Sequence, residues 1–334
     1  MKTPAKIIDV AKRAGVAKST VSNVLTGNKF VSEELKEKVL QACKELDFHP
    51  NFYASGLSSG TSKIIALLLE NNGDIDKSFY KELIIACLKK AAEYDYSLLI
   101  YYNSDSERLL KTLRQGMAPI DGAVLMTPYL NDARLSQIAS DCISCTVIGR
   151  PDEGVAFNYV DVDNVSLVKA VCEKLVGAYG KNIYLINSDF KLTVSIDRMK
   201  GFAEICRKYG VDYESHLFES KESTDTDGYE YAMRVAEKDA VIITPSAFVA
   251  TGVYRAIREK GLKVGEDVGV FALGRSMEHG AFTPKLSYAR QDYGVLGAKA
   301  VEMLMDEIRN GHSEKHVLID SELVIRDSTR AAGE

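Results

Sequence analysis

A row of short polar and cationic side chains near the amino terminus is the part of this 334-residue sequence best suited to contact another molecule. If a helix begins at Lys18, one side of it carries hydrogen-bonding groups and the other a narrow apolar stripe. The polar side consists of Lys18, Ser19, Ser22 and Asn23, and the apolar side of Val21, Val24 and Leu25. Such a helix is typical of those that enter the DNA major groove.

Two further helices are expected to hold this one in place. Residues 7–14 repeat the same apolar spacing, and Gly15 supplies the sharp turn of a helix-turn-helix. A third helix should begin after Ser32, a favourable N-cap residue, and end before Pro50. The first two helices alone would also fit an ordinary helical hairpin, but three together predict a small DNA-binding bundle.

Several blocks of the sequence resemble the lactose/galactose repressor (LacI/GalR) family. The headpiece resemblance rests on residues 9–16, 19–22 and 51–57, and later blocks at 198–202, 250–257 and 290–297 follow the family's order and spacing. The resemblance implies a transcriptional regulator, most simply a repressor, that binds a palindromic operator as a homodimer. Dimerisation also follows from geometry, because one recognition helix reads too few base pairs for genomic specificity.

The resemblance also assigns DNA-contacting residues. Lys18 and Ser19 are expected to contact bases, and Thr20 and Ser22 to contact phosphates. The family usually has arginine where this chain has Asn23, whose amide pairs best with adenine, so the half-site should differ at that base pair. The remaining expected contacts come from Thr26, Phe30, Asn51 and Leu57. A short hinge helix starting near Asn51 would place Leu57 as a wedge in the minor groove.

Charge distribution agrees with a nucleic-acid module at the front of the chain. The net charge is −5, yet residues 1–60 carry nine Lys and Arg against six Asp and Glu, and the remainder 33 against 41. A basic module joined to an acidic body favours DNA binding through one end. No apolar run approaches the roughly 18 residues of a membrane span, and no signal peptide is evident, so a cytoplasmic protein without membrane contact is predicted.

The sequence gives weaker signals for redox, metal-binding or catalytic sites. Cys142 and Cys145 have redox or metal spacing, and His312 and His316 are four residues apart, but buried thiols and a solvated loop are the favoured interpretations. We predict no catalytic residue, no metal site and no cofactor, because no phosphate-binding loop or nucleophile with a placed base is present. Residues 56–60 match a hydrolase pattern in the wrong structural context. The competing classes are therefore a stand-alone small-molecule binding protein and, less favoured, an enzyme.

From Lys63 onwards the pattern predicts an α/β fold of alternating strands and helices. The expected strands are 64–69, 97–102, 122–126, 146–148, 183–186, 240–243 and 268–272. The expected helices are 79–94, 106–115, 133–140, 165–176, 194–209, 227–238, 247–260 and 292–309. Two such series predict two doubly wound subdomains facing each other, and this core resembles periplasmic sugar-binding proteins.

These patterns also predict the domain limits. We expect a headpiece over 1–50, a hinge helix or linker over 51–61, and an effector-binding and dimerisation core over 62–330. Within the core, the N-subdomain should span about 62–160 and 291–319, and the C-subdomain about 161–290 and 320–330.

A cleft between the subdomains should bind a small effector beyond the carboxyl ends of the strands. The resemblance points to Phe79, Asp163, Phe190 and Arg198 as effector contacts. Ser246 and Arg275 stand where the family usually has carboxylates that accept sugar hydroxyls, and Arg150 is expected nearby. A sugar phosphate or sugar acid is thus preferred over a neutral sugar. The alternatives are a regulator that responds to a co-regulator protein, an effector-independent regulator, and a cytoplasmic sugar-binding protein.

Overall fold

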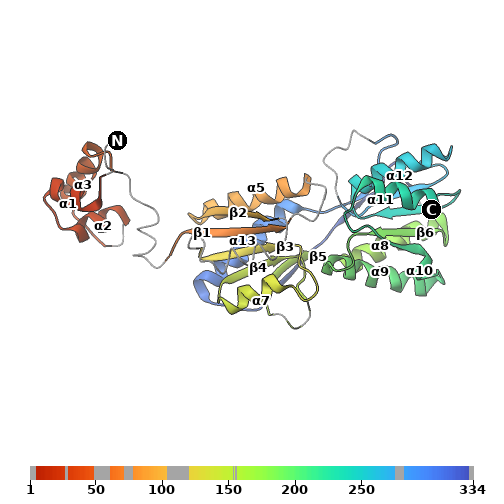
Figure 1. The fold of residues 1–334 in the computed structure, drawn as a ribbon, viewed down its shortest axis with the longest axis horizontal. Coiled ribbons are helices and arrows are strands. Elements are labelled where there is room, and N and C mark those ends of the chain that lie inside the picture. The colour runs from red at the N-terminus through yellow and green to blue at the C-terminus, as the bar shows by residue number, and fades with distance from the viewer. Residues whose placement is uncertain are drawn as a thin grey trace. The chain divides into compact units, whose positions relative to one another are not determined.

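The computed structural model describes residues 5–26, 29–48, 61–70, 78–103, 120–152, 154, 156–274 and 282–330. The chain forms two compact units, Met1–Lys63 and Ile64–Glu334 (Figure 1). The finer domain limits expected from the sequence stay predictions. Within the described residues, no helix is long and apolar enough to cross a membrane.

The first unit is built from three short helices. They are α1 (Ile7–Ala14), α2 (Lys18–Thr26) and α3 (Glu33–Glu45). Gly15 ends α1 with a left-handed φ of 67°, which glycine adopts without steric cost. The fully enclosed core is small and consists of Val10, Ala11, Val21, Val39 and Ala42. The predicted helix-turn-helix bundle is therefore confirmed, and its stability depends on few buried side chains.

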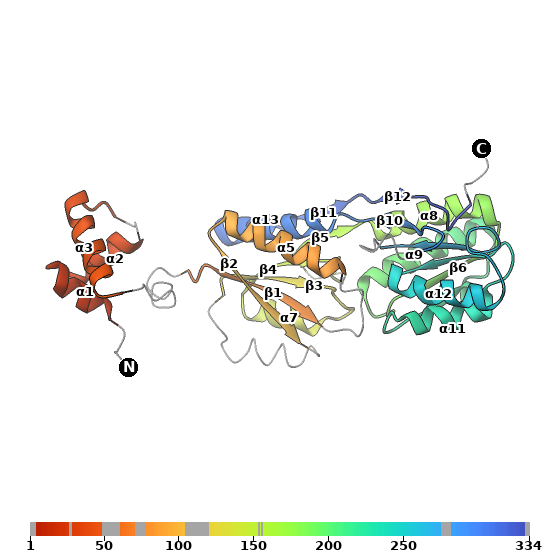
Figure 2. The ribbon, with the colours of Figure 1, turned by 90° about the horizontal axis from the view of Figure 1, so that it is seen from above.

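The second unit begins with a six-stranded parallel sheet of order β11-β5-β4-β3-β1-β2. Its strands are β1 (Ile64–Glu70), β2 (Ser97–Asn103), β3 (Gly122–Met126), β4 (Ser144–Ile148), β5 (Asn158–Val162) and β11 (His316–Ile319). Helices α5 (Ser78–Glu93) and α13 (Tyr293–Asn310) cover one face, and α7 (Ala133–Ser140) covers the other (Figure 2). Because both faces are covered, the central strands are continuous apolar runs.

A second sheet has the order β12-β10-β9-β8-β6-β7, parallel except for β12. Its strands are β6 (Ile183–Asn187), β7 (Leu217–Glu219), β8 (Val241–Thr244), β9 (Gly269–Ala272), β10 (Ser287–Arg290) and β12 (Glu322–Val324). One face carries α8 (Asn164–Tyr179), α9 (Thr193–Tyr209) and the short α10 (Tyr213–His216). The opposite face carries α11 (Asp225–Val235) and α12 (Ala247–Glu259).

The two series of strands and helices agree with the predicted fold class, with local differences. Five strands were not expected, β5, β7, β10, β11 and β12, because each has only three to five residues and includes polar ones. The helix expected over 227–238 ends at Val235, since Ala236 adopts an extended conformation. The helix expected over 106–115 lies outside the described residues.

The chain crosses between the two sheets three times. It passes from β5 into α8, from β10 into α13 and from β11 to β12. We use N-subdomain for the β1 sheet with its helices and C-subdomain for the β6 sheet with its helices. Three crossings joining two sheets allow residues from distant parts of the sequence to line one cleft.

Candidate nucleic-acid interface and core cleft

Helix α2 presents its polar side to solvent. Lys18 and Ser19 are exposed, Thr20, Ser22 and Asn23 are half-buried, and Val21 is fully buried against α1 and α3. The first turn of α2 contains Lys18 and no acidic residue, so the positive end of the helix dipole is not neutralised there. This surface suits an anionic partner such as the DNA backbone.

The structure describes only some of the other residues that are expected to contact DNA. Phe30 lies before α3 and is 98% exposed, which is unusual for an aromatic side chain. Thr26 ends α2, but its side chain, like Asn51 and Leu57, lies outside the described residues. The proposed hinge helix and its minor-groove wedge therefore stay predictions.

A cleft of about 190 Å³ lies between the two subdomains. From the N-subdomain it is lined by residues at or beyond the ends of β3 and β4, including Met126, Thr127 and Ile148. From the C-subdomain, Ser188 follows β6 and Ser246 follows β8. The cleft thus lies at the carboxyl ends of parallel strands, where α/β proteins commonly bind ligands.

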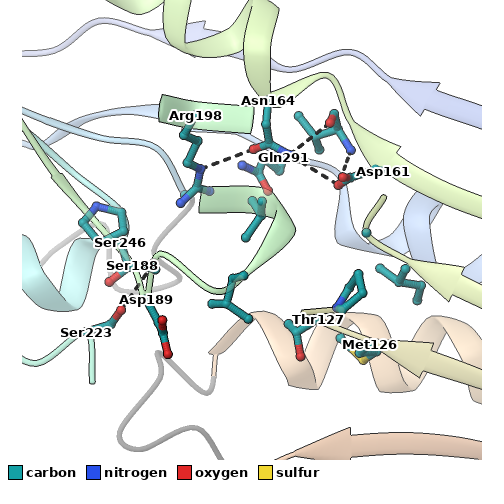
Figure 3. A pocket seen from close by; sticks show the side chains of 18 of the residues that line it. Met126, Thr127, Asp161, Asn164, Ser188, Asp189, Arg198, Ser223, Ser246 and Gln291 are labelled. Atoms are coloured by element: carbon teal, nitrogen blue, oxygen red, sulfur yellow. Dashed lines mark hydrogen bonds between the residues drawn. The ribbon is translucent and has the colours of Figure 1, made fainter. Parts of the chain in front are cut away.

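Arg198 is the most buried cation of the cleft, only 7% exposed (Figure 3). Its Nε donates to Asn164 Oδ1 at 3.3 Å, and among the described residues this is the only hydrogen bond of the side chain. Burial lowers the pKa of the guanidinium, yet arginine keeps its charge under ordinary conditions. The two terminal amino groups are therefore available to a ligand.

The carboxylate of Asp161 hydrogen-bonds to Asn164, and its two oxygens accept three hydrogen bonds in all. Its Oδ1 accepts from the Val162 amide at 2.7 Å and the Asn164 amide at 3.4 Å, and its Oδ2 accepts from the Arg150 amide at 3.0 Å. Burial raises the pKa of this carboxyl to about 6, although the two backbone donors and Arg198 oppose the rise. The carboxylate orients its neighbours and has few free acceptor positions.

A cluster of hydroxyls lines the C-subdomain side of the cleft. Ser223 Oγ donates to Ser188 Oγ at 3.3 Å, and Ser246 Oγ accepts from the Val249 amide at 3.4 Å as the N-cap of α12. Lys221 and Asp189 also line this side. The other lining residues are mainly apolar, so the cleft joins a cation and hydroxyls to apolar walls.

Only some of the residues expected to bind the effector line this cleft. Arg198 and Ser246 do; Arg198 lies on α9, and Ser246 is the N-cap of α12. Arg150 is not among the lining residues; its guanidinium pairs with Asp197, which neutralises its charge. Arg150 therefore adds no net positive charge to the described part of the cleft.

Four other expected contacts are explained by local structure or lie outside the described residues. Asp163 is the N-cap of α8, accepting from the Ser166 amide at 2.9 Å, and Phe190 donates its amide to Glu219 at 3.0 Å. Neither lines the cleft. Phe79 belongs to α5, but its side chain is not described, and Arg275 lies outside the described residues.

Most of the polar residues that line the cleft could not be identified from the sequence. Asn164 follows Asp163, but sequence spacing does not show which of the two side chains faces the cleft. Gln291 lines the cleft and donates to the Leu273 carbonyl at 2.8 Å, and its signal was the block beginning at Arg290. Ser188 and Ser223 gave no signal, because serines in loops are common.

The chain is similar to known bacterial regulators along its whole length. Residues 6–51 match the family model for bacterial regulatory proteins of the lacI family, and residues 173–329 match that for a periplasmic binding protein-like domain. The HTH-type transcriptional regulator RegA of Clostridium saccharobutylicum is 27% identical over 343 residues, covering 97% of this chain and 98% of RegA. AglR, an HTH-type transcriptional regulator of Rhizobium meliloti, is 27% identical over 340 residues, covering 98% and 95%.

Among solved structures, the fold is similar to that of the lac repressor dimer bound to operator and the anti-inducer ONPF. The TM-score is 0.85 at 20% sequence identity, covering 98% of this chain and 100% of the other. At this identity the likeness describes the fold. The relatives in sequence are transcriptional regulators, which are not enzymes.

Proposed function

Because the chain belongs to the lactose/galactose repressor (LacI/GalR) family of bacterial transcriptional regulators, we propose that it binds a palindromic operator as a homodimer under the control of a small effector in its core cleft. It has the family's DNA-binding headpiece and a core like the sugar-binding proteins. The solved relative is a dimer on its operator with a small ligand. The observation that carries the proposal is α2, which exposes Lys18 and Ser19 while Val21 is buried in the headpiece core.

For DNA recognition, Asn23 distinguishes this chain from the family pattern. It is half-buried on α2, four residues after the exposed Ser19. An amide that reaches a base edge pairs best with adenine, whereas arginine pairs best with guanine. The half-site should therefore contain adenine where family members with arginine select guanine.

Selection of bound sequences from random DNA tests this assignment. The wild-type protein should enrich a palindrome with adenine at one position of each half-site. Asn23→Arg should shift that position to guanine by about 1–3 kcal/mol, because a bidentate contact discriminates by that amount. Lys36→Gln, an exposed change on α3, is the control and should leave the selected sequence unchanged. An unaltered half-site in the Asn23 variant would remove the residue from base recognition.

For the effector, we propose a hydroxylated anion such as a sugar acid or sugar phosphate. Arg198 offers two uncommitted amino groups within the described cleft, whereas the oxygens of Asp161 already accept from three donors. Arginine grips carboxylate and phosphate with parallel hydrogen bonds. Ser188, Ser223 and Ser246 supply hydroxyls that suit a polyol. These observations support an anionic group at Arg198 and hydroxyl contacts opposite.

A thermal-shift panel of neutral sugars, sugar acids and sugar phosphates tests the effector class. A true effector present at a hundred times its Kd stabilises the core by about 2.7 kcal/mol, which is readily measured. Only anionic members of the panel should raise Tm. Stabilisation by neutral sugars alone would overturn the anionic assignment without affecting the DNA-binding one.

A further inference from the structure

Along one side of the cleft, an ion pair joins the two subdomains. Arg150, just after β4 of the N-subdomain, donates from Nε and Nη2 to the two carboxylate oxygens of Asp197 on α9, both at 2.8 Å. The side chains are 23% and 9% exposed, so the pair is largely shielded from water. Lys200 approaches Asp197 only to 3.8 Å. Bidentate, shielded pairs of this kind hold two surfaces in one geometry.

A short backbone bridge lies beside this pair. The Leu130 amide donates to the Lys191 carbonyl at 2.9 Å, and the Thr193 amide donates to the Pro128 carbonyl at 3.1 Å. Thr193 Oγ1 donates to the same carbonyl at 3.3 Å. The loop after β3 and the segment leading into α9 thus form a small antiparallel pairing across the cleft, which includes Tyr129 and Leu192.

Close packing and hydrogen bonds hold the loops on the N-subdomain side of the bridge together. In the N-subdomain, Gly149 has a φ of 109°, and a Cβ there would meet Pro128 Cδ at 2.7 Å, so the loops after β3 and β4 pack directly together. The fully buried Arg134 fixes the same loop by donating to the Thr127 carbonyl at 2.9 Å and by pairing with Asp132. In the C-subdomain, the contacts come from one segment, 191–197, at the start of α9.

The contacts between the two subdomains also connect to Arg198, the buried cation of the cleft. Asp197 and Arg198 are neighbours on α9, so the ion pair constrains the helix turn that carries Arg198. Arg198 in turn contacts Asn164, which contacts Asp161, whose Oδ2 accepts from the Arg150 amide. These contacts form a closed ring from α9 through the N-subdomain and back (Figure 3 shows its Arg198–Asn164–Asp161 part).

We propose that the Arg150–Asp197 pair and the Pro128–Thr193 bridge form one inter-subdomain latch, which sets the width of the cleft and the position of Arg198. A ligand that hydrogen-bonds to Arg198 contacts the turn of α9 that also carries Asp197. Such a ligand therefore stabilises the arrangement in which the latch is formed. The inference rests on the proposed function only in taking Arg198 as the effector contact. The latch itself needs neither DNA nor ligand.

Hydrogen exchange of the full-length protein, without DNA or added ligand, tests the latch. The reporters are the Leu130 and Thr193 amides, whose hydrogen bonds cross the cleft. Arg150→Gln and Asp197→Asn should each speed their exchange by about tenfold or more, because hydrogen bonds to charged groups contribute that much. The double variant should exchange no faster than the faster single variant, since both changes remove the same interaction.

Lys169→Gln is the matched control, because Lys169 pairs with Glu204 on α9 at 2.6 Å but within the C-subdomain. It should leave the two reporter amides unchanged. Unchanged exchange in the single variants, additive effects in the double variant, or equal acceleration by Lys169→Gln would each overturn the latch. None of these outcomes depends on operator or effector binding, so failure of the latch is distinguishable from failure of the proposed function.

Discussion

The headpiece and the core cleft arrange their candidate binding residues in opposite ways. The headpiece carries its proposed DNA contacts mainly on one nine-residue helix, α2, so these polar side chains are close together in the sequence. The cleft is concave and gathers residues from 83 to 296 around a buried cation. In the headpiece the partner reaches exposed groups, whereas in the cleft the protein has already committed most of its polar groups to one another.

This difference predicts which substitutions impair each site. In the described part of the headpiece, five buried side chains with partly buried apolar neighbours form a small core, so the arrangement of α2 fails when this core fails. The cleft stands on two large sheets, so a polar change at Arg198 should alter binding and leave the fold intact. Four predictions test this contrast.

The largest effect is expected from Val21→Asp. Val21 is fully buried in the headpiece core, and an unpaired carboxylate there costs several kcal/mol, more than so small a core can supply. Operator affinity, measured by fluorescence anisotropy, should fall more than about 100-fold, while Tm of the core should stay constant because Val21 belongs to the hydrophobic core of the first unit. Lys36→Gln serves as the control. A core Tm that falls with the headpiece would show that the two units depend on each other.

Arg198→Gln should give an intermediate effect confined to the cleft. Losing a charge-assisted pair of hydrogen bonds should weaken binding of an anionic effector by about 10- to 100-fold. Affinity for operator without effector should not change, since Arg198 is proposed to affect DNA binding only through a bound effector. Calorimetry with the best anion from the thermal-shift panel measures the first quantity, and anisotropy the second. Equal loss in Lys169→Gln, a surface change, would mean that the guanidinium has no special role.

The smallest expected effect concerns Asp161 and pH. Its pKa is raised to about 6, so the folded protein holds this proton more tightly than the unfolded chain does. The resulting stability is fully present below the usual carboxyl pKa and is lost as pH rises through 6. Chemical denaturation should therefore show that wild-type protein gains about 1 kcal/mol relative to Asp161→Asn between pH 7 and pH 5. Parallel pH profiles for the two proteins would contradict this assignment.

The same titration should be visible in effector binding. Below pH 6 Asp161 becomes neutral, and an anion beside Arg198 then meets one negative charge fewer. Affinity for a sugar acid, which stays ionised in this range, should rise a few-fold from pH 7 to pH 5 in wild-type protein and stay flat in Asp161→Asn. A sugar acid is the better probe because sugar phosphates titrate near pH 6 themselves.

The headpiece could be predicted from sequence because its signals are local. Apolar spacing, Gly15 and the polar row from Lys18 all fall within one stretch, and the structure confirms the three helices. Long apolar strands such as β1 were equally clear. Short edge strands such as β12 were missed, because their pairing depends on neighbours that come from elsewhere in the sequence.

The cleft could be predicted only in outline. Asp163 and Asn164 are adjacent and both polar, yet the first caps α8 and the second reaches Arg198, a choice made by where the helix begins. Arg150 and Arg198 are the same residue type, yet Asp197 neutralises one and leaves the other open to the cleft. Composition and spacing carry no information on which ion pairs form across two subdomains.

The sequence by itself determined the three-helix headpiece and the alternation that builds two mainly parallel sheets, because each depends on residues within a few turns of one another. The tertiary structure alone decided which polar residues line the cleft, which of its cations is neutralised and where the subdomains are joined. These properties arise from contacts between segments as distant as Pro128 and Thr193, and such contacts exist only after the chain has crossed between its two sheets.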